Sequence, residues 1–226
     1  MKNALFVTGT GTDVGKTYVT ALLIKKLKEM GLDTSYYKAA LSGALQMDSV
    51  LIPGDADYVK HMAHLEDDLS CMVSYVYQEA VSPHLAAQSE GNPVELNKII
   101  SDFQKQCSLH DYVIVEGSGG IICPIRYDES QQIFLVDIIK SLNLETIIVA
   151  DAGLGTINSV CLTVYYLKQQ HIGIKGIIFN NYTGSIMQQD NKKMIELMTG
   201  IPIIGFVHPN GTELIITDTI LKTLYI

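Results

Sequence analysis

Nine residues near the start of the chain, Gly-Thr-Gly-Thr-Asp-Val-Gly-Lys-Thr at positions 9–17, have the composition of a phosphate-binding loop. They follow the apolar run 4–7 and precede a helical pattern, which is the strand, loop and helix order that such a loop needs. Gly15 allows a close backbone approach, and the start of the helix attracts an anion. Lys16 adds a positive charge and Thr17 offers a hydroxyl to Mg²⁺. We therefore predict a nucleotide site that also includes Asp13, Val14 and Tyr18.

The glycines of this loop depart from the common spacing. Counted back from Gly15, the first glycine of the usual motif would fall at Thr10, but the glycines stand at positions 9 and 11. The loop thus carries one more residue between Gly9 and Gly15 than most nucleoside triphosphatases do. This extra residue indicates that the chain belongs to a smaller group of proteins with a deviant phosphate-binding loop.

Two carboxylates are candidates to complete a Mg²⁺ site with Thr17. Glu116 ends a buried-looking strand, and Gly117, Gly119 and Gly120 leave room for a large ligand beside it. Asp55 opens a helical pattern, where it could hold the metal or simply cap the helix. Mg²⁺ prefers a few hard oxygen ligands together with waters and phosphates, so three such groups suffice.

Lys38 is the second candidate cation. It ends a strand-like run, and a lysine there would point to the same sheet edge as Lys16 and stabilise charge on a transferred phosphoryl group. A solvated lysine at a strand end is the alternative. Ser118 does not fit a serine nucleophile, because extended chain follows the 117–120 turn. Among six scattered histidines, His84 is the most site-like, although a lone histidine is more often structural.

Apolar runs alternate with helical patterns along the whole chain. The alternation favours an α/β fold, a doubly wound and mostly parallel sheet with helices on both faces, in one domain spanning residues 1–226. The expected strands are 5–8, 34–38, 112–116, 146–150, 176–179 and 203–207, and the expected helices are 16–30, 56–64, 94–106, 135–142, 156–170 and 186–199. In such folds the ligand lies beyond the carboxyl ends of the strands, where these candidate residues follow.

Composition excludes several classes of protein. The net charge is −8 with a single arginine, which disfavours a nucleic-acid partner. No apolar stretch is long enough to span a bilayer, and the start of the chain does not read as a signal peptide, so we expect a cytoplasmic protein without a membrane partner. The four cysteines have no ligand spacing, which indicates buried, reduced thiols.

The sequence resembles the dethiobiotin synthetase family, which carboxylates a diamine with ATP in biotin biosynthesis. The resemblance rests on motifs in family order over nearly the whole chain: residues 7–17, Tyr37-Lys38 with Ser42-Gly43, Gly54-Asp55-Ala56, Ser82-Pro83-His84, Val115–Gly120, Gly155–Asn158 and Asn180. The extended loop and the Val-Glu-Gly-x-Gly-Gly turn together are fairly specific, whereas each alone is weak.

The resemblance implies a ligase reaction. One amine of 7,8-diaminononanoate takes up CO₂ as a carbamate, whose oxygen attacks the γ-phosphate of Mg·ATP to give a mixed anhydride. The second amine then closes the cyclic urea and expels phosphate. Such chemistry needs no strongly perturbed base, because the protein mainly positions the reactants and supplies positive charge.

The resemblance also implies a role for each matching position. Lys16, Lys38 and Thr12 would be catalytic, Asp13 and Ser42 would hold the diamine or carbamate end, and Thr17, Asp55 and Glu116 would hold Mg²⁺. Family members are homodimers, so the partner subunit would supply Gly155, Thr156 and Asn158 to the substrate carboxylate. The remaining nucleotide contacts would come from Gly117, Ser118, Gly119, Asn180, Asn181, His208, Pro209 and Asn210, with Asn180 and Asn181 at the adenine edge.

Three departures from the family pattern stand out. Residue 13 is Asp where the family commonly has Glu. The segment 207–211 lacks the expected Ile-Pro-aromatic pattern, which leaves nucleotide selectivity open. The helix 186–199 lacks the tyrosine that relatives offer to the substrate carboxylate, and only Lys192 or Lys193 stands nearby.

Three alternatives remain open. Another ligase of the deviant group, of the cobyrinic acid synthase type, would normally need a glutaminase partner or domain. The chain has no spare length for such a domain and no Cys-His arrangement that resembles one. A partitioning ATPase, acting as a switch, carries a signature lysine where this chain has Gly11. A nucleotide-binding protein that has lost catalysis is disfavoured by the intact Lys16, Thr17, Lys38 and Glu116.

Overall fold

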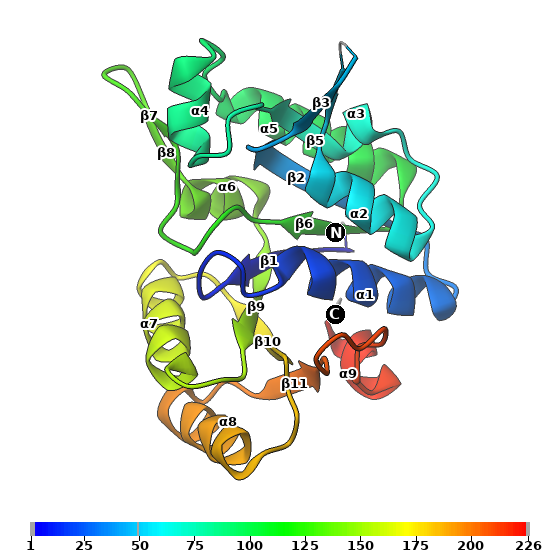
Figure 1. Ribbon diagram of the computed structural model, residues 1–226, viewed down its shortest axis with the longest axis vertical. Helices are drawn as coiled ribbons and strands as arrows, with labels where there is room; N and C mark the ends of the chain where they lie inside the picture. The colour runs from blue at the N-terminus through cyan, green and yellow to red at the C-terminus, as the bar shows by residue number, and fades with distance from the viewer. Residues whose placement is uncertain (1–2, 49, 225–226) are drawn as a thin grey trace.

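A seven-stranded sheet forms the centre of the protein in a computed structural model that describes residues 3–48 and 50–224 (Figure 1). The strand order is β11-β10-β9-β1-β6-β2-β5, and each neighbouring pair is parallel. The predicted domain 1–226 includes residues 1–2, 49 and 225–226, which lie outside the described residues. The strands are β1 (Asn3–Gly9), β2 (Thr34–Leu41), β5 (Val73–Val76), β6 (Tyr112–Glu116), β9 (Glu145–Asp151), β10 (Ile174–Asn180) and β11 (Ile203–Phe206).

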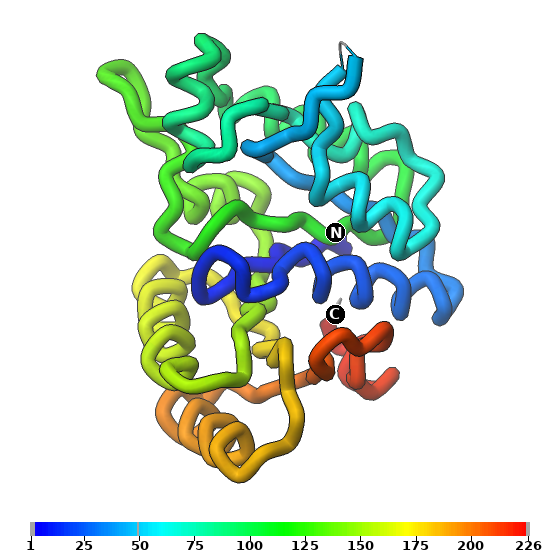
Figure 2. The backbone as a smooth tube through the Cα atoms, in the orientation of Figure 1, coloured from blue at the N-terminus to red at the C-terminus, as the bar shows by residue number. Residues whose placement is uncertain are grey.

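Helices cover both faces of this sheet, so the predicted doubly wound fold is confirmed. One apolar core lies under α1 (Lys16–Glu29), α2 (Gly54–Ala63) and α9 (Asp218–Thr223). The other lies under α4 (Pro83–Ser89), α5 (Leu96–Leu109), α6 (Leu135–Leu142), α7 (Thr156–Gln169) and α8 (Ile186–Thr199). The short α3 (Leu69–Met72) leads into the edge strand β5. The tube in Figure 2 shows the chain crossing between these layers.

Strand β2 shows why the buried strands lack a polar alternation. All eight of its residues are buried. Because successive side chains of a strand point to opposite faces, Tyr36 packs into the core beneath α1, and Tyr37 packs into the core beneath α5. Covering both faces of the sheet therefore removes the exposed side that would otherwise select polar residues.

The sequence-based boundaries are close to the observed ones, with one consequence for the site. Strand β6 and helices α6 and α8 coincide with their predicted ranges, and most others differ by one to three residues. The sequence analysis predicted that Lys38 ends its strand, but β2 continues to Leu41, so Lys38 lies inside the strand. The continuation is apolar and has no turn residue before position 42, which explains why it remains in the strand.

Short elements escaped the sequence analysis. They are β5, α3, α4, α9 and two antiparallel hairpins, β3 (Leu45–Met47) with β4 (Val50–Ile52) and β7 (Pro124–Tyr127) with β8 (Gln132–Phe134). Segments of three to seven residues carry too little periodicity to be identified from sequence. The extended chain that we expected after residue 121 does occur, as β7.

An imidazole links three segments at the amino-terminal edge of the sheet. His110 Nδ1 lies 2.9 Å from Asp33 Oδ1, and His110 Nε2 lies 2.8 Å from Asp67 Oδ1. Burial by itself would lower the pKa of His110, but the hydrogen bonds to the two aspartates outweigh it and raise the pKa. The loop after α2 and the starts of β2 and β6 are thus joined by a titratable group.

The four cysteines, all within the part of the chain that the structure describes, form no disulfide, but they do not all have the burial that we expected. Cys123 is buried, Cys107 and Cys161 are partly exposed, and Cys71 is exposed on the short helix α3. The prediction of uniformly buried thiols is therefore wrong, because the short α3 was not identified. In the described ranges 3–48 and 50–224, no helix is long and apolar enough to cross a membrane.

Candidate active site

The phosphate-binding loop leaves the carboxyl end of β1 and is held between its two neighbours. Thr10 N–H donates to the Val149 carbonyl of β9, and Gly117 N–H, just beyond β6, donates to the Val7 carbonyl. Gly15 caps α1 in the left-handed region, with φ of 88°. A Cβ there would lie 2.2 Å from Asn180 Nδ2, so the fold allows only glycine at this position.

A pocket of about 1220 Å³ opens beside this loop. It is walled by the loop and the start of α1, by the ends of β2 and β6, and by α2 and the segment before α4. Twelve of the predicted site residues line it: Thr12, Asp13, Gly15, Lys16, Thr17, Tyr18, Lys38, Ser42, Asp55, Glu116, Ser118 and Gly119. Residues up to 107 positions apart thus meet because the strand ends converge.

The carboxylate of Glu116 is the centre of a buried polar network. Its Oε1 accepts hydrogen bonds from Thr17 Oγ1 and Lys38 Nζ, each at 2.8 Å. Its Oε2 accepts a hydrogen bond from the Tyr36 hydroxyl at 3.1 Å. Lys38 also pairs with Asp55 Oδ2 at 2.5 Å. Because the side chain of Glu116 is fully buried and that of Lys38 is only 5% exposed, Lys38 is not the solvated lysine of the alternative interpretation.

The two lysines of the pocket have different electrostatic surroundings. Burial lowers the pKa of Lys16, and the negative charge of Glu116 only partly opposes this effect. Burial would also lower the pKa of Lys38, but Glu116 and Asp55 outweigh it and raise the pKa. Tyr36 has a pKa well above its ordinary value because of its burial and the neighbouring Glu116, so its hydroxyl is a donor. Lys38 therefore keeps its charge near neutral pH.

Other predicted residues of the pocket are engaged with the backbone. Lys16 Nζ donates to the Gly11 carbonyl at 2.8 Å, within the loop itself. Ser42 Oγ donates to the Val81 carbonyl at 2.5 Å, and Ser118 Oγ donates to the Ala40 carbonyl at 2.7 Å. The two serines therefore tie the pocket walls together, while Asp55 is not a helix cap, since Pro53 precedes α2 in that position.

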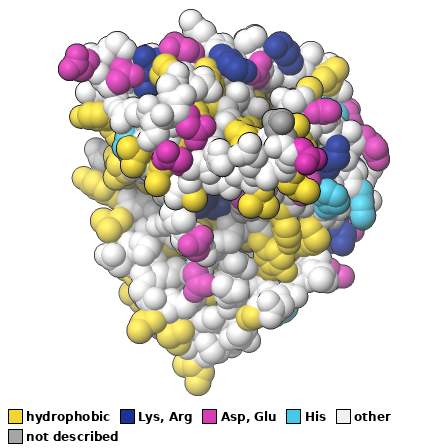
Figure 3. Space-filling model, turned by 45° about the horizontal axis from the view of Figure 1, so that its top comes forward, with side chains coloured by type: hydrophobic (Ala, Val, Ile, Leu, Met, Phe, Trp, Pro, Cys, Tyr) yellow, Lys and Arg dark blue, Asp and Glu magenta, His cyan; other side chains and the backbone are white. Residues whose placement is uncertain are grey.

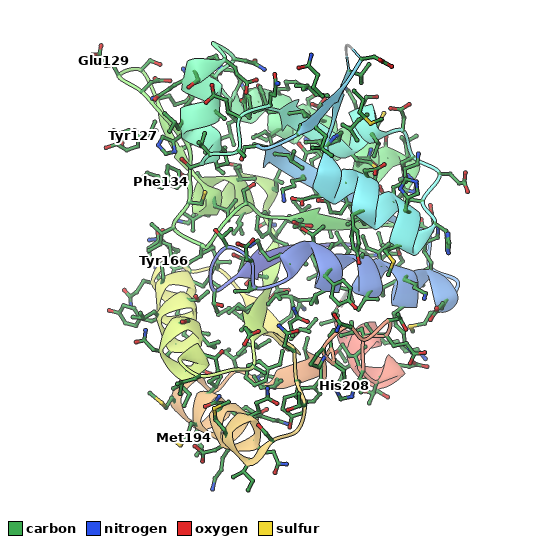
Figure 4. All side chains as sticks on the ribbon, in the orientation of Figure 1. Tyr127, Glu129, Phe134, Tyr166, Met194 and His208 are labelled. Carbon is green, nitrogen blue, oxygen red and sulfur yellow. The ribbon has the colours of Figure 1, made fainter. Side chains whose placement is uncertain are left out.

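The residues predicted to contact the base lie outside the lining of this pocket but next to the loop. Asn180, at the end of β10, donates from Nδ2 to the Val14 carbonyl at 3.1 Å, and its Oδ1 is buried without a partner. Asn181 donates to Asp151 Oδ2 at 2.6 Å. His208, labelled in Figure 4, lies just beyond β11, where its Nδ1 is 2.6 Å from the Tyr182 carbonyl oxygen.

The segment 207–211 is connected to the nucleotide loop by a tyrosine. The hydroxyl of Tyr18, in the first turn of α1, donates to the Gly211 carbonyl. Pro209 and Asn210 therefore lie in a segment anchored to α1, and Asn210 has a positive φ of 54°. The segment 207–211 therefore lies beside the nucleotide loop although it lacks the Ile-Pro-aromatic pattern of the family.

Gly155, Thr156 and Asn158 lie at the start of α7, away from the main pocket. Gly155 and Asn158 line a separate cavity of about 580 Å³ together with apolar residues of α7 and α8. Thr156 is buried, and its Oγ1 has no hydrogen-bond partner among the described residues. The start of α7 thus has an unpaired donor next to exposed apolar side chains, among them Leu154, Leu162, Tyr165 and Met198.

Sequence reasoning did not identify several residues of the site, among them three side chains that could take part in its chemistry. Tyr36 contacts Glu116, and Tyr58 and Cys123 line the pocket. Tyr36 carried a usable signal, because it stands two residues before Lys38 and side chains at that spacing share a face of a strand. Tyr58 and Cys123 had no comparable signal. His84, the most site-like histidine in the sequence, does not line the pocket.

The donor set of the pocket fits Mg²⁺. Among the described residues, no group of three or more His, Cys, Asp or Glu side chains could hold a metal ion by itself. Thr17, Asp55 and Glu116 instead bring one hydroxyl and two carboxylates around Lys38. Hard oxygens in small number are what Mg²⁺ takes from a protein when phosphates and waters complete its shell.

Comparisons with known proteins agree with this arrangement. Residues 3–213 match the family described as an AAA domain. The chain is 54% identical to the ATP-dependent dethiobiotin synthetase BioD of Brachyspira hyodysenteriae, over 92% of each chain. It is 50% identical to the enzyme of the same name from Clostridium botulinum strain Loch Maree, over 90% of this chain and 89% of that protein.

Solved structures with the same fold include more distant proteins. A ParA family ATPase from Chlorobium tepidum matches with a TM-score of 0.57 at 16% identity, over 99% of this chain and 89% of its own. A MinC:MinD cell division complex from Aquifex aeolicus matches with a TM-score of 0.54 at 15% identity, over 91% of this chain and 81% of its own. At such identities the likeness shows the fold alone.

Proposed function

The chain belongs to the ATP-dependent dethiobiotin synthetases, and on that premise we propose that it closes the cyclic urea of dethiobiotin from 7,8-diaminononanoate, CO₂ and ATP. The protein is an enzyme of the ligase class, and the relatives do not favour the amide-ligase or switch alternatives. The observation that carries the proposal is the buried network in which Lys38, Thr17 and Asp55 surround Glu116 beside the phosphate-binding loop.

The proposed reaction conserves atoms in three steps. An amine of the substrate adds to CO₂ and loses a proton, which gives a carbamate. A carbamate oxygen attacks the γ-phosphorus of ATP and ADP leaves, which gives a carbamic–phosphoric anhydride. The second amine then attacks the carbonyl carbon and loses a proton, and phosphate leaves with the C–O electron pair. Each step needs positive charge near oxygen atoms more than it needs a base.

The residues of the pocket supply that charge and the positioning. We assign Lys16 and Lys38 to the phosphoryl and carbamate oxygens, and the hydroxyl of Thr12 to the same end. Asp13 and Ser42 lie in the lining beside them and orient the diamine. Holding reactants in one geometry lowers the barrier because their translational freedom is already lost on binding.

Mg²⁺ would be held by Thr17, Asp55 and Glu116, and when bound it neutralises charge on the phosphates. The hard-oxygen donor set supports this assignment. Lys38 now uses two of the three groups, so it must share or release these oxygens when a cation binds.

We assign the nucleotide base to the side of the loop where Asn180 lies. Its Nδ2 is already used by the Val14 carbonyl, so its Oδ1 remains as an acceptor for the amino group of adenine. The backbone of 117–119 and the segment 207–211, through His208, Pro209 and Asn210, would flank the nucleotide. Asn181 supports this edge by holding Asp151.

We further propose that the protein is a homodimer joined through α7 and α8. Leu154 is 93% exposed and Tyr165 is 65% exposed, and apolar side chains of this size gathered around a cavity favour a protein partner. The start of α7, with the unpaired Thr156 hydroxyl, would then receive the substrate carboxylate from the partner's pocket.

The remaining proposals concern the setting of the enzyme. We propose one catalytic domain over residues 1–226 and a cytoplasmic location, to which cysteines that form no disulfide in the described residues are suited. Nucleic acid is not expected as a partner, and the face shown in Figure 3 carries scattered Lys and Arg side chains without a continuous basic patch.

The test is a product assay. ADP release would be measured with Mg·ATP and bicarbonate, with and without 7,8-diaminononanoate, alongside detection of the cyclic urea by mass spectrometry. We expect ADP and dethiobiotin only when the diamine is present. ADP formation that does not depend on the diamine, or its complete absence with folded protein, would contradict the proposal.

A further inference from the structure

Tyr36 contacts the carboxylate of Glu116 but does not line the pocket. Its side chain is fully buried, in the core beneath α1 and α2. Its hydroxyl lies 3.1 Å from Glu116 Oε2, whereas Thr17 and Lys38 both use Oε1 at 2.8 Å. The two oxygens of one carboxylate therefore have separate partners, one structural and one that faces the pocket.

We propose that Tyr36 is a positioning residue for the divalent cation, which holds Glu116 Oε2 so that Oε1 stays directed at Thr17 and the metal. The inference rests on the proposed function, because it takes Thr17, Asp55 and Glu116 as the cation ligands. Tyr36 does not touch the reactants and acts only through Glu116.

The geometry of the sheet explains why this hydroxyl is effective. Strands β2 and β6 pair in parallel, with Lys38 opposite Glu116 and Tyr36 opposite Ile114. Tyr36 and Lys38 share a face of β2, and from that strand they donate to different oxygens of Glu116. The last torsion of a glutamate side chain is soft, so without the phenol the carboxylate can rotate and change which oxygen faces the pocket.

The hydrogen bond from Tyr36 to Glu116 matters more because Lys38 and a bound cation compete for the other oxygen of that carboxylate. The ammonium of Lys38 and a cation both require Glu116 Oε1. When Lys38 moves aside, the carboxylate keeps only Thr17 and Tyr36 as protein partners. Partners that orient a metal ligand typically change metal affinity by about 10- to 100-fold.

The test compares Tyr36→Phe with Tyr37→Phe. Tyr37 is the next residue of β2 and is also buried, but its hydroxyl contacts Ser74 Oγ at 2.6 Å and the Ile99 carbonyl at 3.1 Å, on the opposite face of the sheet. Each variant thus loses one buried phenol hydroxyl. Binding of Mn²⁺, in the presence of a non-hydrolysable ATP analogue, would be measured by electron paramagnetic resonance.

We expect Tyr36→Phe to weaken Mn²⁺ binding by about 10-fold or more, and Tyr37→Phe to change it by less than about twofold. In a Glu116→Ala background, Tyr36→Phe should have no further effect on Mn²⁺ binding, because there is no side-chain oxygen left at position 116 to orient. A general loss of structure would weaken binding in both backgrounds.

Three outcomes would overturn the inference. Equal Mn²⁺ affinity in Tyr36→Phe and Tyr37→Phe would show that the phenol does not position the ligand. An effect of Tyr36→Phe that persists in the Glu116→Ala background would show that it does not act through Glu116. If the wild-type protein with the analogue binds no Mn²⁺, the proposed cation site itself fails, which separates this failure from that of Tyr36 alone.

Discussion

The replacement Lys38→Met should destabilise the protein through the charge that it leaves behind. Methionine matches the length of the lysine stem but removes the ammonium 2.8 Å from Glu116 Oε1. Glu116 is fully buried, so its carboxylate would lose its strongest partner in a medium of low dielectric constant. Breaking a buried ion pair on one side costs about 3–5 kcal/mol.

The lower end of that range applies here. Glu116 keeps hydrogen bonds from Thr17 and Tyr36, and Asp55, the other carboxylate, is 40% exposed to water. We therefore expect a loss of about 3 kcal/mol in the free energy of unfolding. For a chain of this size that corresponds to a fall in Tm of about 6–12 °C.

A double-mutant cycle isolates the pair. In Glu116→Gln the amide oxygen still accepts from Thr17 and its NH₂ group can donate to the Tyr36 oxygen, so the double variant Lys38→Met/Glu116→Gln leaves no unpaired charge in the core. The carboxylate of Asp55 also loses Lys38, but it is 40% exposed to water. Its cost should be about 2–3 kcal/mol less than the sum of the single variants. Unfolding of all four proteins would be followed by circular dichroism in urea.

The control is an exposed lysine, and the cycle has a clear negative result. Lys105 pairs with Asp102 at 3.1 Å but is 72% exposed, so Lys105→Met should cost less than about 0.5 kcal/mol. If the effects of Lys38→Met and Glu116→Gln instead add to within about 0.5 kcal/mol, the buried pair is not coupled as described and the reasoning is refuted.

Three further predictions address the loop, the sheet edge and the proposed dimer. Gly15→Ala should abolish ATP binding, measured by calorimetry, because the Cβ of the alanine would collide with Asn180. The control Gly184→Ala, at a similar φ of 77° but with open space around it, should leave ATP binding intact. Equal ATP affinity in the two variants would contradict this account. The folded pKa of His110 is raised, so its contribution to stability is present below its unfolded pKa of about 6.5 and is lost as pH rises through the folded value. The loss of stability in His110→Gln, measured by urea unfolding, should therefore shrink with rising pH. A loss that stays constant from pH 5 to 9 would count against the aspartate contacts. Tyr165→Glu should give a monomer by light scattering and lower the affinity for the diamine more than that for ATP, and an unchanged dimer would place the interface elsewhere.

Much of the fold and part of the site follow from local patterns. The loop at 9–17, the buried strands and the amphipathic helices are encoded in short stretches, so their positions could be predicted to within a few residues. The predicted convergence of Thr17, Lys38, Asp55 and Glu116 follows from one general property, that parallel strands end at a common edge.

The pairing inside the site could not be obtained in this way. Local patterns place Tyr36 on the same face of β2 as Lys38, but nothing local indicates that both side chains meet Glu116 or that Lys38 also reaches Asp55. Those contacts depend on the register of β2 against β6. A shift of one residue would turn Lys38 to the opposite face of the sheet.

Sequence alone thus determined the elements and the chemistry that the nucleotide loop can perform, because glycine, lysine and hydroxyl positions act over a few residues. The tertiary structure decided the partners of each charge, because contacts between residues 36, 38, 55 and 116 form only when separate strands and α2 come together. It also placed the start of α7 outside the main pocket and beside a separate cavity, which local sequence patterns do not predict.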